Sequence, residues 1–126
     1  MQPLIDAIFS ISTDIRYVAV YRDGTLNSAV KPGVEDASGS DSDIYEELIV
    51  NPTILTLVKQ RGDIDCGGAE FVLIRYGSFY QFVAPMQVGH VSICIEPHAN
   101  PLNLVESIRS VLRSYAVSSK KGMDEK

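Results

Sequence analysis

The sequence is poor in cysteine, contains no tryptophan, and has fewer basic than acidic residues. Two cysteines, Cys66 and Cys94, are too few for a disulfide framework in a chain of 126 residues, so we expect free thiols in a reducing cytoplasm. Eleven Lys and Arg stand against sixteen Asp and Glu, which gives a net charge of −5. This deficit argues against nucleic acid or an anionic membrane as the partner, because both bind basic surfaces.

Long hydrophobic runs are also missing. The start MQPLIDAIF lacks the basic region, apolar stretch and cleavage site of a secretory leader, so none is expected. No apolar run approaches the roughly eighteen residues that suggest a membrane span. Hydrophobic residues nevertheless make up 45% of the chain and charged residues 21%, which excludes a disordered chain and a coiled coil. The length is that of one domain, with a core large enough to fold without a metal or disulfide.

Motifs for phosphate binding and catalysis are absent as well: the sequence has no GxxxxGK[ST], GxGxxG or GxSxG pattern. His90, Cys94 and His98 are spaced four apart, but four strand residues span roughly 13 Å, too far to share one metal ion. Cys66 has acidic neighbours that disfavour a thiolate, and the two glycines after it more simply permit a bend. We therefore predict no enzyme, no cofactor and no metal; an enzyme that uses one of these cysteines or histidines is the weaker alternative.

Hydrophobic periodicity and turn residues predict the order α-β-β-α-β-β-β-α. Asp23-Gly24 between two extended runs is a strong hairpin signal. The final helix, opened by Asn100-Pro101, has the cleanest helical period in the chain. The predicted helices cover 3–12, 44–61 and 101–116, and the predicted strands cover 15–21, 25–31, 69–76, 79–85 and 88–96, the last beginning at 88 or 90. Because the strands are apolar on both faces, we predict an α+β fold with a five-stranded antiparallel sheet between helices on both faces.

The predicted central helix, 44–61, has more apolar residues than one buried stripe needs. Ser42 or Asp43 is its expected N-cap and Gly62 its expected end, while Asn51-Pro52 predicts a kink or a restart. Its apolar residues are Ile44, Leu48, Ile49, Ile54, Leu55, Leu57 and Val58. Either the helix is unusually buried, or it presents an apolar surface to a partner.

An acidic segment leads into this helix. Between Lys31 and Lys59 the chain has six carboxylates and no basic residue. Residues 34–43, VEDASGSDSD, are therefore a predicted loop that either docks a partner or a cation, or is a solvated linker followed by an acidic first helical turn. We favour the linker, because negative charge is stabilising at a helix N-terminus.

The tyrosines also allow two interpretations, an RNA-binding surface or a place in the core or an interface. Tyr17, Tyr21, Tyr76 and Tyr80 lie in or beside predicted strands, where aromatic rings could stack on RNA bases. Such a surface would need interleaved basic residues, which are too few here. We predict that these tyrosines lie in the core or in an interface.

The order of elements resembles the Roadblock family of dynein light chains and their bacterial relatives, whose fold is a profilin-like three-layer sandwich. The matching segments are YVAVYRDGTLNSAV, DIYEELIVNPTILTLVKQRG, FVLIRYGSFYQFVAP, VSICIEP and NPLNLVESIRSVL. The resemblance covers roughly residues 2–116, which gives a predicted domain at 1–116 followed by a disordered charged tail at 117–126.

This resemblance implies a function. Members of the family form homodimers through the central helix and the strand after it, and the apolar excess on that helix is what such a dimer would bury. Transferred to this chain, the implied interface comprises Tyr45, Leu48, Ile49, Val50, Phe71, Val72 and Leu73. The family scaffolds or regulates protein partners, often Ras-like small GTPases, and some bacterial members stimulate the partner's GTPase without catalytic residues of their own. The expected function is a non-enzymatic homodimeric interaction module in the cytoplasm.

A small-molecule sensor domain of the PAS or GAF kind has a related layout and is the alternative. Such a domain holds a ligand between sheet and helix. The bulky Phe and Tyr residues predicted for these strands would fill that space, which disfavours this reading.

Overall fold

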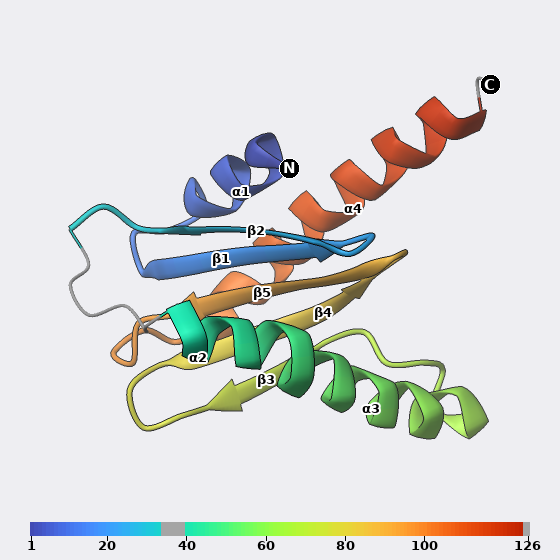
Figure 1. The fold of residues 1–126 in the computed structure, drawn as a ribbon, viewed down its shortest axis with the longest axis horizontal. Helices are drawn as coiled ribbons and strands as arrows, with labels where there is room; N and C mark the ends of the chain where they lie inside the picture. The colour runs from blue at the N-terminus through green and yellow to red at the C-terminus, as the bar shows by residue number, and fades with distance from the viewer. Residues whose placement is uncertain (34–39, 125–126) are drawn as a thin grey trace.

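A computed structural model describes residues 1–33 and 40–124. The chain forms one antiparallel sheet with helices on both faces, which confirms the predicted fold class (Figure 1). Its elements are α1 (Gln2–Phe9), β1 (Ile15–Arg22), β2 (Thr25–Val30), α2 (Ser40–Tyr45), the π-helical turn η1 (Glu46–Val50), α3 (Asn51–Asp65), β3 (Val72–Arg75), β4 (Tyr80–Met86), β5 (Gly89–Ile95) and α4 (Leu102–Asp124). Because α2, η1 and α3 follow one another without a break, we call them together the central helix.

The sheet has the strand order β2-β1-β5-β4-β3. Asp23 and Gly24 both have positive φ, 56° and 84°, and form the turn of the predicted β1–β2 hairpin. β1 and β5 pair at the centre, so the first and last strands of the chain hold the sheet together. β2 and β3 lie at the edges, and no other strand of the described residues pairs with their outer sides.

The two faces of the sheet differ in chemistry. Strand residues alternate between faces, and one set packs with α1 and α4 into an apolar core: Leu4, Ile5, Ile8, Ile15, Val18, Val20, Phe82, Ala84, Val91, Ile93, Ile95 and Ile108. The other face lies under the central helix, which Figure 1 shows in front of the sheet. This face includes the buried polar side chains Gln81, His90 and Ser92. Buried polar side chains need hydrogen-bonding partners, from the helix or from one another.

A kink or a restart was predicted at Asn51-Pro52, and of these the restart is wrong, because the central helix continues through both residues. Asn51 has helical angles, φ −64° and ψ −46°, and its N–H donates to the carbonyl of Glu46, five residues back. Pro52 has no N–H, so it cannot donate to the carbonyl four residues earlier. The π turn directly before Pro52 rearranges the hydrogen bonds without breaking the helix.

Both ends of the central helix also differ from the prediction. The helix begins at Ser40, so Ser42 and Asp43 lie inside it and do not cap it. It ends at Asp65, beyond Gly62, which is buried where a Cβ would lie 2.8 Å from the Gly68 backbone. Gly68, with φ 90°, takes part in the bend that follows.

Other predicted boundaries shift by a few residues. α1 ends at Phe9, and β3 is shorter than predicted, starting at Val72 and ending at Arg75. α4 continues to Asp124, past the predicted domain limit at 116, and the division into 1–116 and a tail at 117–126 remains a prediction. Most of the predicted acidic loop, 34–39, lies outside the described residues.

The close approach of β1 and β5 at Gly89 leads to a prediction about stability. Gly89 pairs with Arg22, and a Cβ at position 89 would lie 1.7 Å from the Tyr21 carbonyl oxygen. Gly89→Ala must therefore push the two central strands apart, and we expect it to lower the free energy of unfolding by about 2 kcal/mol or more in urea denaturation. Gly77→Ala is the matched control, since a Cβ there meets nothing within 4 Å. Equal stability of the two variants would contradict the prediction.

Candidate functional site

The central helix buries one carboxylate completely against the sheet. Glu47 lies in the π turn and has an exposed fraction of 0%. Its neighbours in sequence, Tyr45, Leu48 and Ile49, are exposed on the outer side of the same helix. An ionised carboxylate without partners would be very costly at such a position, so its hydrogen bonds decide whether the helix can pack there.

Glu47 receives hydrogen bonds from three different elements. The Tyr17 hydroxyl of β1 donates to Oε2 at 3.2 Å, and Asn51 Nδ2 of α3 donates to Oε1 at 2.9 Å. His90 of β5 places Nε2 2.8 Å from Oε1, and with Glu47 ionised this nitrogen donates. The imidazole ring also stacks on Tyr21, with ring centroids 5.7 Å apart. Glu47 thus connects the two central strands to the helix that covers them.

The same burial suppresses ionisation around Glu47. Burial, reinforced by the charges of Glu47 and Asp43, raises the pKa of Tyr17 well above that of a free tyrosine. Burial, and then the charge of Glu47, likewise raises the pKa of Cys94 far above that of a free thiol. Cys94 is therefore a neutral thiol near pH 7, which argues against it as a nucleophile.

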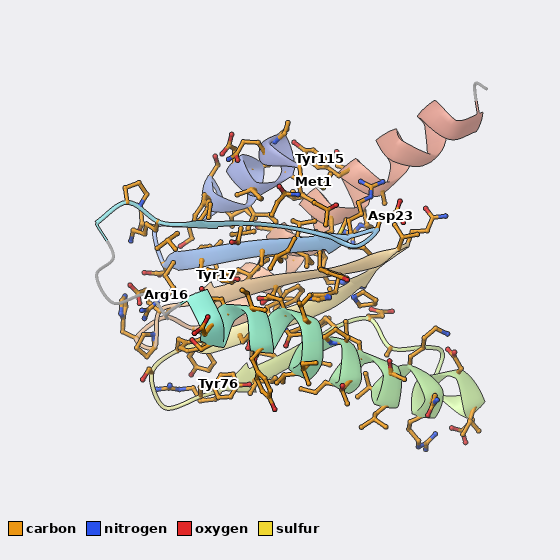
Figure 2. The ribbon with its side chains drawn as sticks, viewed as in Figure 1. Met1, Arg16, Tyr17, Asp23, Tyr76 and Tyr115 are labelled. Atoms are coloured by element: carbon orange, nitrogen blue, oxygen red, sulfur yellow. The ribbon has the colours of Figure 1, made fainter. Side chains whose placement is uncertain are left out.

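A cavity of about 320 Å³ opens beside this cluster, between the N-terminal part of the central helix and the β3–β4 connection. Figure 2 shows Tyr17 and Tyr76, which both line it, near that part of the helix. The lining residues are Tyr17, Ser42, Asp43, Glu46, Glu47, Tyr76, Gly77, Ser78, Phe79, Gln81 and Cys94. The cavity wall therefore combines carboxylates with aromatic rings.

Three polar side chains of this wall, those of Glu46, Tyr76 and Gln81, are partly or fully buried. Glu46 accepts a hydrogen bond from the Tyr76 hydroxyl at 3.2 Å, and burial raises the pKa of both groups. Gln81 is 1% exposed and donates from Nε2 to Ser92 Oγ at 2.7 Å, while its Oε1 has no hydrogen-bond partner among the described residues. Buried hydrogen-bond acceptors in proteins normally have a donor, so this oxygen is an exception.

The residues predicted for the dimer interface lie in two different environments. Tyr45, Leu48 and Ile49 are 61%, 42% and 52% exposed on the outer side of the central helix. Val50, Phe71, Val72 and Leu73 are half-buried. Phe71 and Leu73 pack against the apolar core, with Phe71 stacked on Phe82 at 5.3 Å between centroids.

The other sequence candidates do not assemble into a site. Cys66 is exposed beside Asp65, whose pKa is lowered by the Arg61 hydrogen bond and then by Cys66. His98 is exposed and lies 3.1 Å from Asp14, away from the buried His90. Within residues 1–33 and 40–124, no three His, Cys, Asp or Glu side chains are placed to hold one metal ion. No helix in the same ranges is long and apolar enough to cross a membrane.

Comparison with known proteins supports the fold. A crystal structure of a Roadblock/LC7 domain from Streptomyces avermitilis matches this chain with a TM-score of 0.68 and 13% sequence identity. The match covers 90% of this chain and 92% of that one, which confirms the predicted Roadblock-like fold. No protein-family model matches the sequence, and no curated protein matches it either.

The buried cluster predicts a large effect of removing its carboxylate. Glu47→Ala leaves the hydroxyl of Tyr17, the imidazole of His90 and the amide of Asn51 without their common acceptor. We expect the free energy of unfolding to fall by about 2–4 kcal/mol in urea denaturation. Glu106→Ala, on the exposed side of α4, should change it by no more than about 0.5 kcal/mol. A Glu47 variant as stable as this control would show that the cluster contributes little.

The raised pKa of Tyr17 predicts a loss of stability in alkali. Above pH 10, the ordinary pKa of a tyrosine side chain, the unfolded chain releases this proton while the folded chain retains it, so unfolding becomes easier as pH rises. Tyr17→Phe removes this contribution. Its stability should decline less steeply than the wild type's above pH 10, by up to about 1.4 kcal/mol per pH unit. Between pH 7 and 9 the two slopes should coincide, and parallel curves above pH 10 would contradict the assignment.

Proposed function

We propose that this protein is a homodimeric interaction module of the cytoplasm, which scaffolds or regulates a protein partner and catalyses no reaction itself. The observation that carries the proposal is the exposed apolar surface of the central helix. Ile44, Tyr45, Leu48 and Ile49 are each between 42% and 61% exposed. Contiguous apolar surface of this kind is typical of protein–protein interfaces.

The neighbouring edge strand supports the same proposal. β3 lies at the edge of the sheet, and Val72 pairs with Val83, on the face that the central helix covers. An edge with free N–H and C=O groups can pair with a second strand. Two copies joined along β3 would extend the sheet and bring the two central helices together. Val72 would then lie near the new contact, whereas Phe71 and Leu73 would support the strand from the core side.

A Ras-like small GTPase is the partner class that we propose for this module. The support is the Roadblock-like fold, together with the regulatory role that the family resemblance implies. A regulator of this kind acts by binding and positioning, so it needs no nucleophile or metal of its own.

The proposed dimer can be tested directly in solution. The wild type should sediment as a dimer in analytical ultracentrifugation, and Leu48→Asp should lower the association constant by about 100-fold or more, because each interface then buries two carboxylates. Leu102→Asp is the matched control: Leu102 is equally apolar and 67% exposed, but it begins α4 on the opposite face of the sheet. A monomeric wild type, or a Leu48→Asp variant that dimerises normally, would refute the proposed interface.

The partner class needs a separate experiment. The immobilised wild type is incubated with native cell extract containing either GDP or a non-hydrolysable GTP analogue, and the bound proteins are identified by mass spectrometry. We expect a small GTP-binding protein whose recovery differs between the two nucleotides. If the recovery is the same with both nucleotides, or if no GTP-binding protein is recovered, the GTPase assignment is contradicted. Neither result tests the proposed dimer.

A further inference from the structure

A second cavity lies between α3 and the sheet. Its volume is about 410 Å³, within the range of small-molecule sites. Residues of α3, of the bend that follows it and of the strands β1, β4 and β5 form its wall. We call it the α3 cavity, and its wall combines a buried imidazole with apolar side chains.

His90 brings a polar atom without a partner to this cavity. The residue is 2% exposed, and its Nε2 is engaged by Glu47, which does not line the α3 cavity. The other ring nitrogen, Nδ1, makes no hydrogen bond to the described residues. The side-chain atoms that are fully enclosed without a partner in the described part of the chain are Asn51 Oδ1 and Gln81 Oε1, so Nδ1 keeps access to solvent. Because His90 lines the α3 cavity, that access leads into it.

The wall beside His90 is aromatic and apolar. Tyr21 also lines the cavity and stacks on the His90 ring, with the centroids 5.7 Å apart and the planes inclined by 23°. The apolar side chains that complete this part of the wall are those of Pro52, Leu55, Pro85 and Met86. Such a wall favours an aromatic ligand, because rings pack well on other rings and methionine sulfur contacts them favourably.

The charged residues of the wall compensate each other. Lys59 and Asp63 form an ion pair at 2.5 Å, and their side chains are 72% and 51% exposed, so the pair lies at the mouth of the cavity. No other Lys, Arg, Asp or Glu is among the described residues that line it. A charged ligand would therefore lose its hydration without gaining a free counter-charge, and a neutral ligand fits better.

We propose that the α3 cavity binds an uncharged aromatic molecule with a hydroxyl group, such as a phenol. Its ring packs beside Tyr21, and its hydroxyl forms a hydrogen bond with Nδ1 of His90. A hydroxyl both donates and accepts, so it pairs with Nδ1 whether or not this nitrogen carries the imidazole proton. An ether only accepts and an indole N–H only donates, so each of these fits one tautomer alone.

This site goes beyond the proposed function and does not depend on it. The lining of the α3 cavity includes no residue of the predicted dimer interface, which comprises Tyr45, Leu48, Ile49, Val50, Phe71, Val72 and Leu73. Loss of the ligand and loss of the dimer can therefore be observed separately.

The test is a titration of the full chain with phenol, followed by amide chemical shifts in NMR and by calorimetry. The amides of Gly68, Ala69 and Gly89, which line the cavity, should shift saturably below about 10 mM phenol. Fluorobenzene has nearly the same shape without the hydroxyl, and should bind at least about threefold more weakly. The ¹⁵N resonance of His90 Nδ1 should move with phenol and stay in place with fluorobenzene, because only the hydroxyl can bond to this nitrogen.

A matched pair of variants locates the ligand. Leu55→Trp places a larger ring in the wall of the cavity and should weaken phenol binding by about tenfold or more. Leu57→Trp is the control, since Leu57 belongs to the same helix, is 61% exposed and does not line this cavity. Its phenol binding should equal that of the wild type. The amide spectrum of each variant shows beforehand whether it is folded.

Four results would each overturn the proposal: no saturable shift of the lining amides, equal or tighter binding of fluorobenzene, an Nδ1 resonance that phenol leaves in place, or equal phenol binding by the two tryptophan variants. If Leu55→Trp does not fold, the two ligands and the Nδ1 resonance decide the question on the wild type. None of these outcomes depends on whether the chain dimerises or binds a GTPase.

Discussion

The packing of this fold depends on one buried carboxylate. Glu47 is held by Tyr17, Asn51 and His90, which belong to three different elements. A buried carboxyl group tolerates few alternative arrangements, because each lost hydrogen bond leaves a desolvated polar group. These contacts therefore set the rotation and depth of the central helix on the sheet. With Glu47 turned inward, Leu48 and Ile49 must lie outward, and Asp43 and Glu46 must border the adjoining cavity. The apolar surface and the acidic cavity are two consequences of one constraint.

The architecture could be predicted because short sequence patterns indicate most of its turns and helices. Asp23-Gly24 can form a tight hairpin turn with positive φ, and the apolar spacing from Leu104 onward repeats with the period of one helical face. The central helix was harder, because Asn51-Pro52 is typical of a helix start. The helix continues through a π turn, in which the Asn51 N–H donates to the carbonyl of Glu46. The tertiary contacts at this turn are those of Glu47 with Tyr17 and His90 of the strands. Single residues next to a proline do not reveal such a contact.

The candidate site was largely hidden from sequence reasoning for a similar reason. Glu47 is one of six carboxylates in a short stretch, and such charges usually lie in solvent at a helix start. A usable signal was present in the strands, where Gln81, His90 and Ser92 interrupt otherwise apolar runs and fall on one face. Polar residues that alternate with Val and Ile in a sheet covered on both sides require a polar partner above them. The likeness to the Streptomyces avermitilis domain at 13% identity shows that the fold is reached with largely different residues.

The π turn also changes the geometry of the helix as a whole. A π-helical turn contains about one residue more than an α-helical turn, and one residue corresponds to about 100° of rotation. Side chains before Glu46 are therefore offset from those after Asn51, relative to a regular α-helix of the same sequence. The helix therefore has two side-chain registers, one on each side of the π turn. Inside the turn, Glu47 faces the sheet while Leu48 and Ile49 beside it face outward.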